Sequence, residues 1–132
     1  MYARGRGRIV NIASAHGLVA SAQKAAYVAA KHGLVGLTKV VALEAARTPV
    51  TCNAICPGWV RTPLVERQII DRAKASGRTV EEEAALLLSE KEPTVRFTTV
   101  GEIGAMVAFL ASDAAGNITG AAFSLDGGWT AQ

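Results

Sequence analysis

Cysteine is scarce in this sequence of 132 residues, which contains only Cys52 and Cys56. If both lie on one strand, they point to the same face about 13 Å apart, which is too far for a disulfide bond. We therefore expect two buried thiols in a reducing compartment rather than a disulfide-stabilised secreted domain. The sequence gives no indication of a metal site.

Long apolar runs and clustered charge are also missing. No uninterrupted apolar run approaches the roughly 20 residues of a membrane span, and Asn11 breaks any signal-peptide hydrophobic region after the basic start. The net charge is only +3, and basic residues cluster only at Arg4, Arg6 and Arg8, whereas nucleic-acid binding would require a basic face with aromatic platforms. We therefore expect a cytoplasmic protein that binds neither a membrane nor nucleic acid.

Half of the residues are apolar, which is ample for the core of one domain of this length. Short apolar runs predict strands over 8–13, 50–56 and 122–125. A helical pattern over 23–47 ends before a threonine and a proline. Its two glycines, Gly33 and Gly36, more often indicate close helix packing than function.

Helix-start signals divide the second half of the chain. A threonine N-cap followed by proline predicts a helix over 63–75. Two capping boxes, each a threonine followed three residues later by glutamate, predict helices over 80–89 and 100–112. The order strand, helix, strand, helices, strand is typical of right-handed crossovers in a parallel sheet. The sequence thus predicts an α/β fold with about three parallel strands and flanking helices.

Three polar residues early in the chain have spacings that chemistry explains better than packing does. Ser14 follows the first predicted strand, and Tyr27 and Lys31 stand at i and i+4 of the first predicted helix, stacked about 6 Å apart along its axis. An ammonium fixed beside a phenol favours the phenolate, as an acid/base catalyst for an alcohol or a carbonyl requires. Because open α/β sheets bind ligands at the carboxyl ends of their strands, the Ser14 hydroxyl can hydrogen-bond the same reacting oxygen.

The spacing Ser-x12-Tyr-x3-Lys resembles the catalytic segment of the short-chain dehydrogenase/reductase family. A Tyr-x-x-x-Lys pair alone is common and is most often an exposed helical pair. Here the segments NIASAHG at 11–17, NAICPG at 53–58 and DGG at 126–128 also match the family in order and spacing. The sequence is therefore identified as a member of this family, with the serine, tyrosine and lysine above in the catalytic roles.

The resemblance covers nearly the whole chain but only about the carboxyl-terminal half of a family member. It implies a single partial domain, residues 1–132, from the carboxyl-terminal half of a Rossmann-type doubly wound parallel sheet. The amino-terminal dinucleotide-binding half, with its glycine-rich turn, and the asparagine of the family's catalytic tetrad are missing. The strand over 8–13 would then expose an apolar edge. We expect either a homo-oligomer or pairing with the missing half to cover that edge.

The resemblance also implies a substrate pocket. Four residues are similar to those that surround a small 3-hydroxy acid in family members that interconvert D-3-hydroxybutyrate and acetoacetate, namely His16, Lys24, Gln68 and Trp129. The first three can hold a carboxylate by hydrogen bonds, and the tryptophan would close the pocket with apolar surface. Taken singly, each is more often a solvated residue or, for the tryptophan, a core residue. Together, in this motif context, they predict a pocket.

A nicotinamide site is implied as well. The resemblance assigns contacts with the nicotinamide end of the cofactor to Tyr27, Lys31, Pro57, Gly58, Val60 and Thr62. The helices over about 63–89 correspond to a mobile lid that excludes water. NAD is the expected cofactor, and NADP stays open because the discriminating residue would lie upstream.

Three functions remain open for the chain. The resemblance implies the catalytic half of an oxidoreductase that interconverts D-3-hydroxybutyrate and acetoacetate with NAD. The same catalytic residues would belong to an acetoacetyl or 3-oxoacyl reductase, although His16, Lys24 and Gln68 favour a free carboxylate. The third function is an inactive folded fragment that serves as an assembly module. This is the expectation for the chain by itself, since orientation of the cofactor supplies a large part of the rate.

Overall fold

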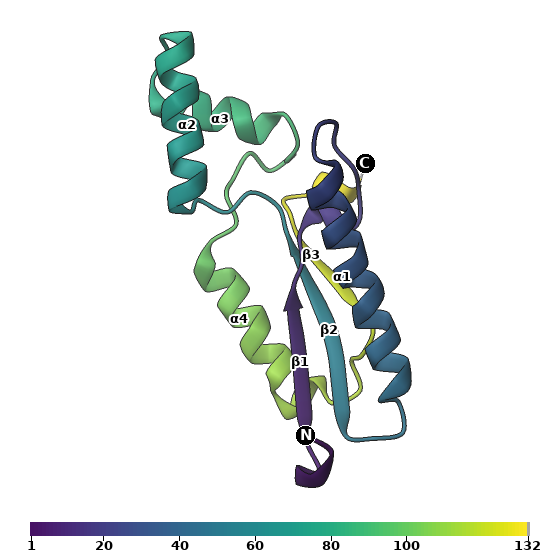
Figure 1. Ribbon diagram of the computed structural model, residues 1–132. Coiled ribbons are helices and arrows are strands. Elements are labelled where there is room, and N and C mark those ends of the chain that lie inside the picture. Colours follow the sequence, from purple (N-terminus) through teal and green to yellow (C-terminus); the bar gives the residue numbers. More distant parts are fainter. Residues whose placement is uncertain (132) are drawn as a thin grey trace.

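The computed structural model describes residues 1–131. Three strands, β1 (Gly7–Ile12), β2 (Val50–Pro57) and β3 (Ala122–Leu125), form one parallel sheet in the order β1-β2-β3 (Figure 1). Ile12 pairs with Ile55, and Pro57 pairs with Leu125. Because the strands run in the same direction, their carboxyl ends meet at one edge of the sheet.

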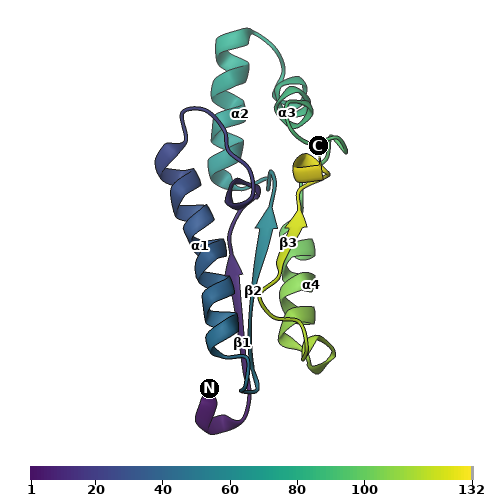
Figure 2. The ribbon, with the colours of Figure 1, turned by 90° about the vertical axis from the view of Figure 1, so that its right-hand side faces the viewer.

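Helices cover both faces of this sheet. In Figure 2, α1 (Ala25–Glu44) and α4 (Val100–Ala111) lie on opposite sides of the strands. Two more helices, α2 (Pro63–Ser76) and α3 (Val80–Ser89), lie beyond the carboxyl ends of the strands. Four single 3-10 turns complete the described elements: Tyr2–Arg4, Ala15–Gly17, Asp113–Ala115 and Trp129–Ala131. The predicted α/β fold, half of a doubly wound parallel sheet, is confirmed.

Local signals set most of the helix boundaries. The side chains of Thr79 and Thr99 accept hydrogen bonds from the N–H groups of Glu82 and Glu102, whose carboxylates complete the two capping boxes. The predicted starts of α2, α3 and α4 are therefore correct. α1 is shorter than the predicted 23–47. At its carboxyl end, single three-residue turns replace the helical hydrogen bonds, as in the bond from the Thr48 N–H to the Ala45 oxygen.

The middle strand forms the centre of the core. All eight residues of β2 are buried, as expected for a strand that has helices on both faces and a neighbour on each edge. Ala54 and Cys56 pack with Val35 of α1, whereas Ile55 packs with Leu110 of α4. Successive side chains of β2 point to opposite faces of the sheet, so this one strand packs against both helical layers.

Asn53, a buried polar residue of β2, has its hydrogen-bond partners within the fold. The Asn53 amide donates to the Ile118 oxygen at 2.7 Å and accepts from the Ala121 N–H at 3.1 Å, which ties β2 to the segment before β3. Cys52 and Cys56 are buried free thiols, as predicted, and burial raises the pKa of each.

The outer edge of β1 and the outer side of α1 have few neighbours. Among residues 1–131, β1 pairs only with β2. Apolar side chains of α1, among them Leu37, Val40 and Leu43, are exposed. An added methyl group at Gly33 or Gly36 would meet nothing within 4 Å. The close packing predicted for these two glycines is therefore not found among the described residues.

α1 is long and apolar enough to cross a membrane by length and composition alone, although the sequence has no uninterrupted apolar run of that length. Core helices of α/β domains meet the same criterion. Here Val35, Thr38 and Ala42 of α1 are buried, and the Asn11 amide of β1 donates to the Thr38 hydroxyl at 2.9 Å. In this structure, α1 is one layer of the α/β fold.

The helices α2 and α3 form a separate pair, which we call the lid. Ile69, Ala84 and Leu87 are buried between them. The two ends of the lid lie together, because Val60 and Thr98 form a parallel bridge and the Thr98 N–H donates to the Trp59 oxygen at 2.9 Å. The lid is therefore a helical insertion whose entry and exit are fastened to each other.

Glu83 is the main ionic residue of the lid. Its side chain is 3% exposed and accepts from Arg72 at 3.1 Å and from Arg78 at 3.0 Å. The Ser76 hydroxyl and the guanidinium groups of Arg78 and Arg72 hold the pKa of Glu83 below its ordinary value, against the opposing effect of burial. Because the three partners lie on α2 and on the turn between the helices, Glu83 links both halves of the lid.

We expect Glu83→Gln to loosen the lid, because two guanidinium groups lose their charged acceptor in a nearly buried position. Hydrogen–deuterium exchange of the amides over 63–89 should become faster at neutral pH, with little change in β2. A carboxyl with a lowered pKa stabilises the fold above its unfolded pKa, and this stabilisation is lost as the pH falls through the folded pKa. The difference from the parent chain should therefore shrink in acid. Glu81→Gln removes an exposed carboxylate of the same helix; equal exchange in the two variants would contradict the expectation.

Candidate active site

The carboxyl ends of the three strands meet at one cleft. Beyond β1, the Ala13 N–H donates to the Ile55 oxygen at 2.7 Å, which extends the pairing to the residue before Ser14. Beyond β2, the Gly58 N–H donates to the Leu125 oxygen at 3.0 Å. A cleft of about 840 Å³ opens there, between the start of α1, the loop over 57–62 and the lid helix α2.

The cleft collects every site residue predicted from the sequence. Its lining includes Ser14, Tyr27 and Lys31, then His16, Lys24, Gln68 and Trp129, and also Pro57, Gly58, Val60 and Thr62. These residues come from five separate parts of the chain, and the fold brings them together in one cleft. Their roles in catalysis and binding remain predictions.

Tyr27 and Lys31 have the helical spacing that the sequence predicts. α1 begins at Ala25, which places Tyr27 in the first turn and Lys31 one turn later. The phenol side chain is 48% exposed. The Lys31 ammonium lies 5.7 Å from the centre of the Tyr27 ring and donates to the Ile12 oxygen at 3.0 Å. The end of β1 therefore holds the ammonium beside the phenol.

Ser14 is oriented by the turn that follows it. Its hydroxyl oxygen accepts from the His16 N–H at 3.1 Å, so the hydroxyl proton stays available for another acceptor. The turn packs closely on α1, because a methyl group at Gly17 would lie 2.9 Å from the Lys31 carbonyl oxygen and from a Val35 methyl carbon. Glycine at this position allows the serine turn to lie against the helix that carries the tyrosine.

His16 is buried in the wall of the cleft. Its ring contacts Tyr27 and Trp129 edge to face, with centroid distances of 5.7 and 4.9 Å. The Nε2 atom lies 3.0 Å from the Ser21 hydroxyl oxygen. Burial lowers the pKa of His16, and the charges of Lys24 and Lys91 lower it further. His16 is therefore a neutral imidazole at neutral pH.

The charge of the cleft is positive. Lys24 and Lys31 line it, and no aspartate or glutamate does so in the part of the chain that the structure describes. The Lys24 ammonium lies 5.4 Å from the centre of the Trp59 ring, and that of Lys91 lies 6.0 Å from the Trp129 ring. Because Lys24 and Lys31 line the cleft and no described carboxylate does, the site favours an anionic ligand.

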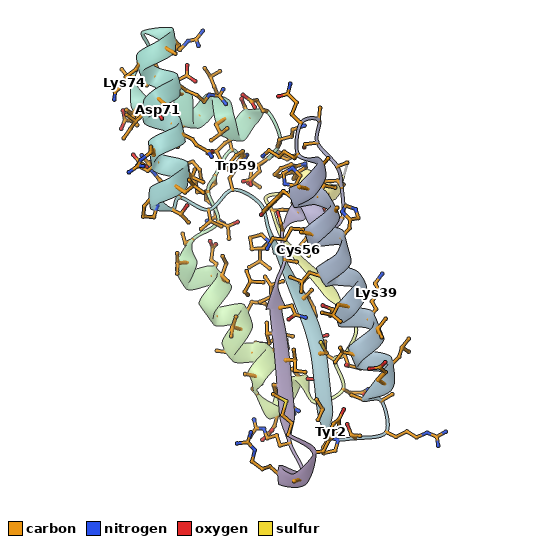
Figure 3. The ribbon with its side chains drawn as sticks, in the orientation of Figure 1. Tyr2, Lys39, Cys56, Trp59, Asp71 and Lys74 are labelled. Carbon is orange, nitrogen blue, oxygen red and sulfur yellow. The ribbon has the colours of Figure 1, made fainter. Side chains whose placement is uncertain are left out.

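Sequence reasoning missed several residues of the cleft. Trp59 follows the Pro-Gly pair directly and could have been found from that position; in Figure 3 it lies between the lid and the start of α1. Gln23 lines the cleft with a positive φ of 63°, which the sequence does not signal in a glutamine. Lys91 reaches Trp129 from beyond α3, a proximity that only the tertiary structure creates.

A parallel sheet with helices on both faces, and a cleft at the carboxyl ends of its strands, is the arrangement of a Rossmann-type fold. Residues 1–130 match a family model described as enoyl-(acyl carrier protein) reductase. The chain belongs to the short-chain dehydrogenase/reductase family.

Two curated relatives cover nearly all of the chain. The D-beta-hydroxybutyrate dehydrogenase of Cupriavidus necator is 60% identical over 126 residues, which are 96% of this chain and 49% of the relative. The D-beta-hydroxybutyrate dehydrogenase of Rhizobium meliloti is 56% identical over 132 residues, which are 100% of this chain and 51% of the relative. The chain thus spans about half the length of the curated relatives it matches.

Solved structures show the same arrangement of elements. The L-sorbose reductase of Gluconobacter frateurii, complexed with NADPH and L-sorbose, matches with a TM-score of 0.94 at 27% identity over 100% of this chain and 50% of that one. The actinorhodin polyketide ketoreductase with NADPH matches with a TM-score of 0.87 at 38% identity over 98% of this chain and 49% of that one.

We expect Lys24→Met to raise the pKa of His16, because the substitution removes the largest charge effect that lowers it. The increase should be partial, since burial is the larger cause and remains. The chain has only two histidines, so an NMR titration of the imidazole protons resolves His16 directly. Lys39→Met, on the outer side of α1 (Figure 3), is the matched control. A His16 midpoint that does not differ between the two variants would refute the electrostatic account.

Proposed function

We propose that this chain is the catalytic and substrate-binding half of an oxidoreductase that interconverts D-3-hydroxybutyrate and acetoacetate with NAD. One observation carries the proposal. The Ser-Tyr-Lys cluster shares its cleft with His16, Lys24 and Gln68, and the described lining of that cleft contains two lysines and no carboxylate. Such a cleft suits a small hydroxy acid. The two relatives named D-beta-hydroxybutyrate dehydrogenase support the same substrate.

The substrate carboxylate would lie among Lys24, His16 and Gln68. The ammonium supplies the attraction, while the neutral imidazole and the amide supply directed hydrogen bonds. Trp129 is 8% exposed and presents an apolar surface to the cleft, which suits the methyl end of a four-carbon acid. The carboxylate is thereby bound at a fixed distance from the reacting carbon.

The reaction needs a base for the hydroxyl proton. Tyr27, as phenolate, accepts the proton of the 3-hydroxyl group, and the Lys31 ammonium beside it stabilises that phenolate. The Ser14 hydroxyl donates a hydrogen bond to the reacting oxygen as the carbonyl forms. In the reverse direction, the Tyr27 phenol protonates the ketone oxygen.

A nicotinamide cofactor supplies the hydride chemistry when bound. Pro57, Gly58, Val60 and Thr62 would hold its nicotinamide end, and Lys31 its ribose. The residues fit such a group in one specific respect. The Trp59 indole N–H is buried without a hydrogen-bond partner among residues 1–131, and Trp59 lines the same cleft. A polar ligand beside this loop would provide the acceptor that a buried donor requires.

The proposal includes a partner polypeptide. The outer edge of β1 and the apolar outer side of α1 are suited to a further strand and helix, because an unpaired apolar edge favours association. The other half of a family member, or a second copy of this chain, would cover them and complete the site.

We expect Tyr27→Phe to abolish turnover, because the variant keeps the ring and loses the acid/base group. General acid–base catalysis contributes about 10²- to 10⁴-fold to rates. The assay follows NADH absorbance with NAD and D-3-hydroxybutyrate, using the chain alone and the chain mixed with a polypeptide that supplies the other half of a family member. Tyr2→Phe changes the only other tyrosine and should leave the rate unchanged.

Turnover of the chain alone would rule out the inactive assembly module. Turnover only in the mixture would support the proposed pairing. If neither preparation reacts, although the mixture forms a complex by light scattering, the proposed activity is wrong.

Lys24→Met should separate a free acid from an acyl thioester substrate. Losing a charged hydrogen bond costs about 1.5–3 kcal/mol, so the KM for D-3-hydroxybutyrate should rise about 10- to 100-fold. The KM for its methyl ester should change little, because the ester has no charge to lose. Lys39→Met controls for the loss of a lysine on α1. Equal losses on acid and ester, or better turnover of acetoacetyl thioesters by the parent, would favour the acyl reductase.

A further inference from the structure

Glu92 is a buried carboxyl that the proposed reaction does not use. It follows α3 and is 1% exposed. One carboxyl oxygen accepts the backbone N–H of Trp59, while the other is buried with no partner in the described chain. Burial of a carboxyl with a single hydrogen bond is unfavourable, so this position must offer a compensating gain.

The carboxyl of Glu92 lies between two loops that border the cleft. A side chain at Gly58 would collide with it, and the same added carbon would lie 2.9 Å from the Asp126 Cα atom. A side chain at Gly127 would lie 3.2 Å from the second Glu92 oxygen. The Thr94 N–H donates to the Gly127 oxygen at 3.1 Å. Glycine in both loops therefore makes room for this carboxyl.

We propose that Glu92 is a positioning residue whose carboxyl fastens the 57–62 loop to the turn over 126–128. The Glu92 carboxyl binds the loop through the backbone N–H of Trp59. Two residues later, the Thr94 N–H binds the Gly127 oxygen of the turn. Because the loop lines the same cleft as Tyr27, fastening limits how far this wall of the cleft can move. The consequence for the cofactor rests on the proposed function, whereas the fastening itself does not.

The two carboxyls near the turn differ in how many hydrogen bonds they accept. Asp126 accepts three hydrogen bonds, from the Gly128 N–H at 3.1 Å, the Thr130 N–H at 3.1 Å and the Thr130 hydroxyl at 2.6 Å. Glu92 accepts one. A buried carboxyl with a single donor ionises less readily than one with three donors, so ionisation of Glu92 is unfavourable at this position.

The surrounding groups agree with this conclusion. Burial raises the pKa of Glu92, and the Asp126 charge in the facing turn raises it further. The Trp59 N–H of the loop and the more distant Arg96 oppose the increase. For an acid whose folded pKa is raised, the folded arrangement loses stability as the pH rises through that value. The fastening should therefore weaken as the pH increases.

The test follows Trp59 alone. The chain has two tryptophans, so W129F leaves Trp59 as the only one and removes the ring that contacts His16. Emission and acrylamide quenching are measured from about pH 5 to about pH 9, a range in which buried glutamates titrate. In this background, quenching should rise in one step with increasing pH.

Three substitutions of the W129F chain decide the outcome. E92Q keeps the acceptor without a charge, so Trp59 should stay protected over the whole range. E92A removes the acceptor, so quenching should be severalfold higher even at low pH. E81Q removes an exposed carboxylate and should titrate as the W129F chain does.

The proposal is overturned if E92Q titrates like the W129F chain, or if E92A is as protected as E92Q. If E92A does not fold, the comparison of E92Q with the W129F chain still decides. No substrate or cofactor enters the measurement. A failure here is therefore distinguishable from a failure to turn over D-3-hydroxybutyrate.

Discussion

The parallel alignment of β1 and β3 on either side of β2 is the constraint on which the site depends. Two hydrogen bonds extend the alignment past the strand ends, from Ala13 to Ile55 and from Gly58 to Leu125. They bring three segments to the same edge of the sheet: the turn after β1 that contains Ser14, the 57–62 loop after β2, and the turn after β3 that contains Asp126. A shift of one residue would reverse which side chains face each helix layer, and would thus disrupt both the core and the cleft.

Local signals made most of the fold predictable. Threonine N-caps and capping boxes involve residues only a few positions apart. The apolar composition of a strand reflects its burial on both faces. Both signals can be recognised in a short stretch of sequence. The start of α1 was predicted too early because Gln23 adopts a positive φ, which its residue type does not encode. Tyr27 and Lys31 were found because helical spacing alone places them together. Lys91 and Glu92 were missed, since their proximity to the site depends on the chain returning from α3 to the 57–62 loop. Trp59 was also missed, although its position directly after the Pro-Gly pair could have indicated it.

The cleft combines a histidine whose pKa is lowered with two lysines in its lining, and the two features are linked. Burial against Trp129 and the charges of Lys24 and Lys91 lower the pKa of His16. The Lys24 ammonium, which lines the cleft, also attracts an anion. A bound carboxylate would offset the effect of the lysines and favour a proton on His16. Anion binding and protonation of His16 should therefore be coupled.

The lid and the cleft are mechanically connected through one short region. Within the lid, the apolar contacts of Ile69 and the ion pairs of Glu83 join α2 to α3, so the pair should move as a unit. Its connections to the sheet are the 57–62 loop and the segment over 92–98, which meet at the bridge of Val60 with Thr98. The Leu125 carbonyl accepts both the Gly58 N–H and the Thr98 hydroxyl. Glu92 lies at this same junction. A movement of the lid would therefore also displace the 57–62 loop, which lines the same cleft as Tyr27.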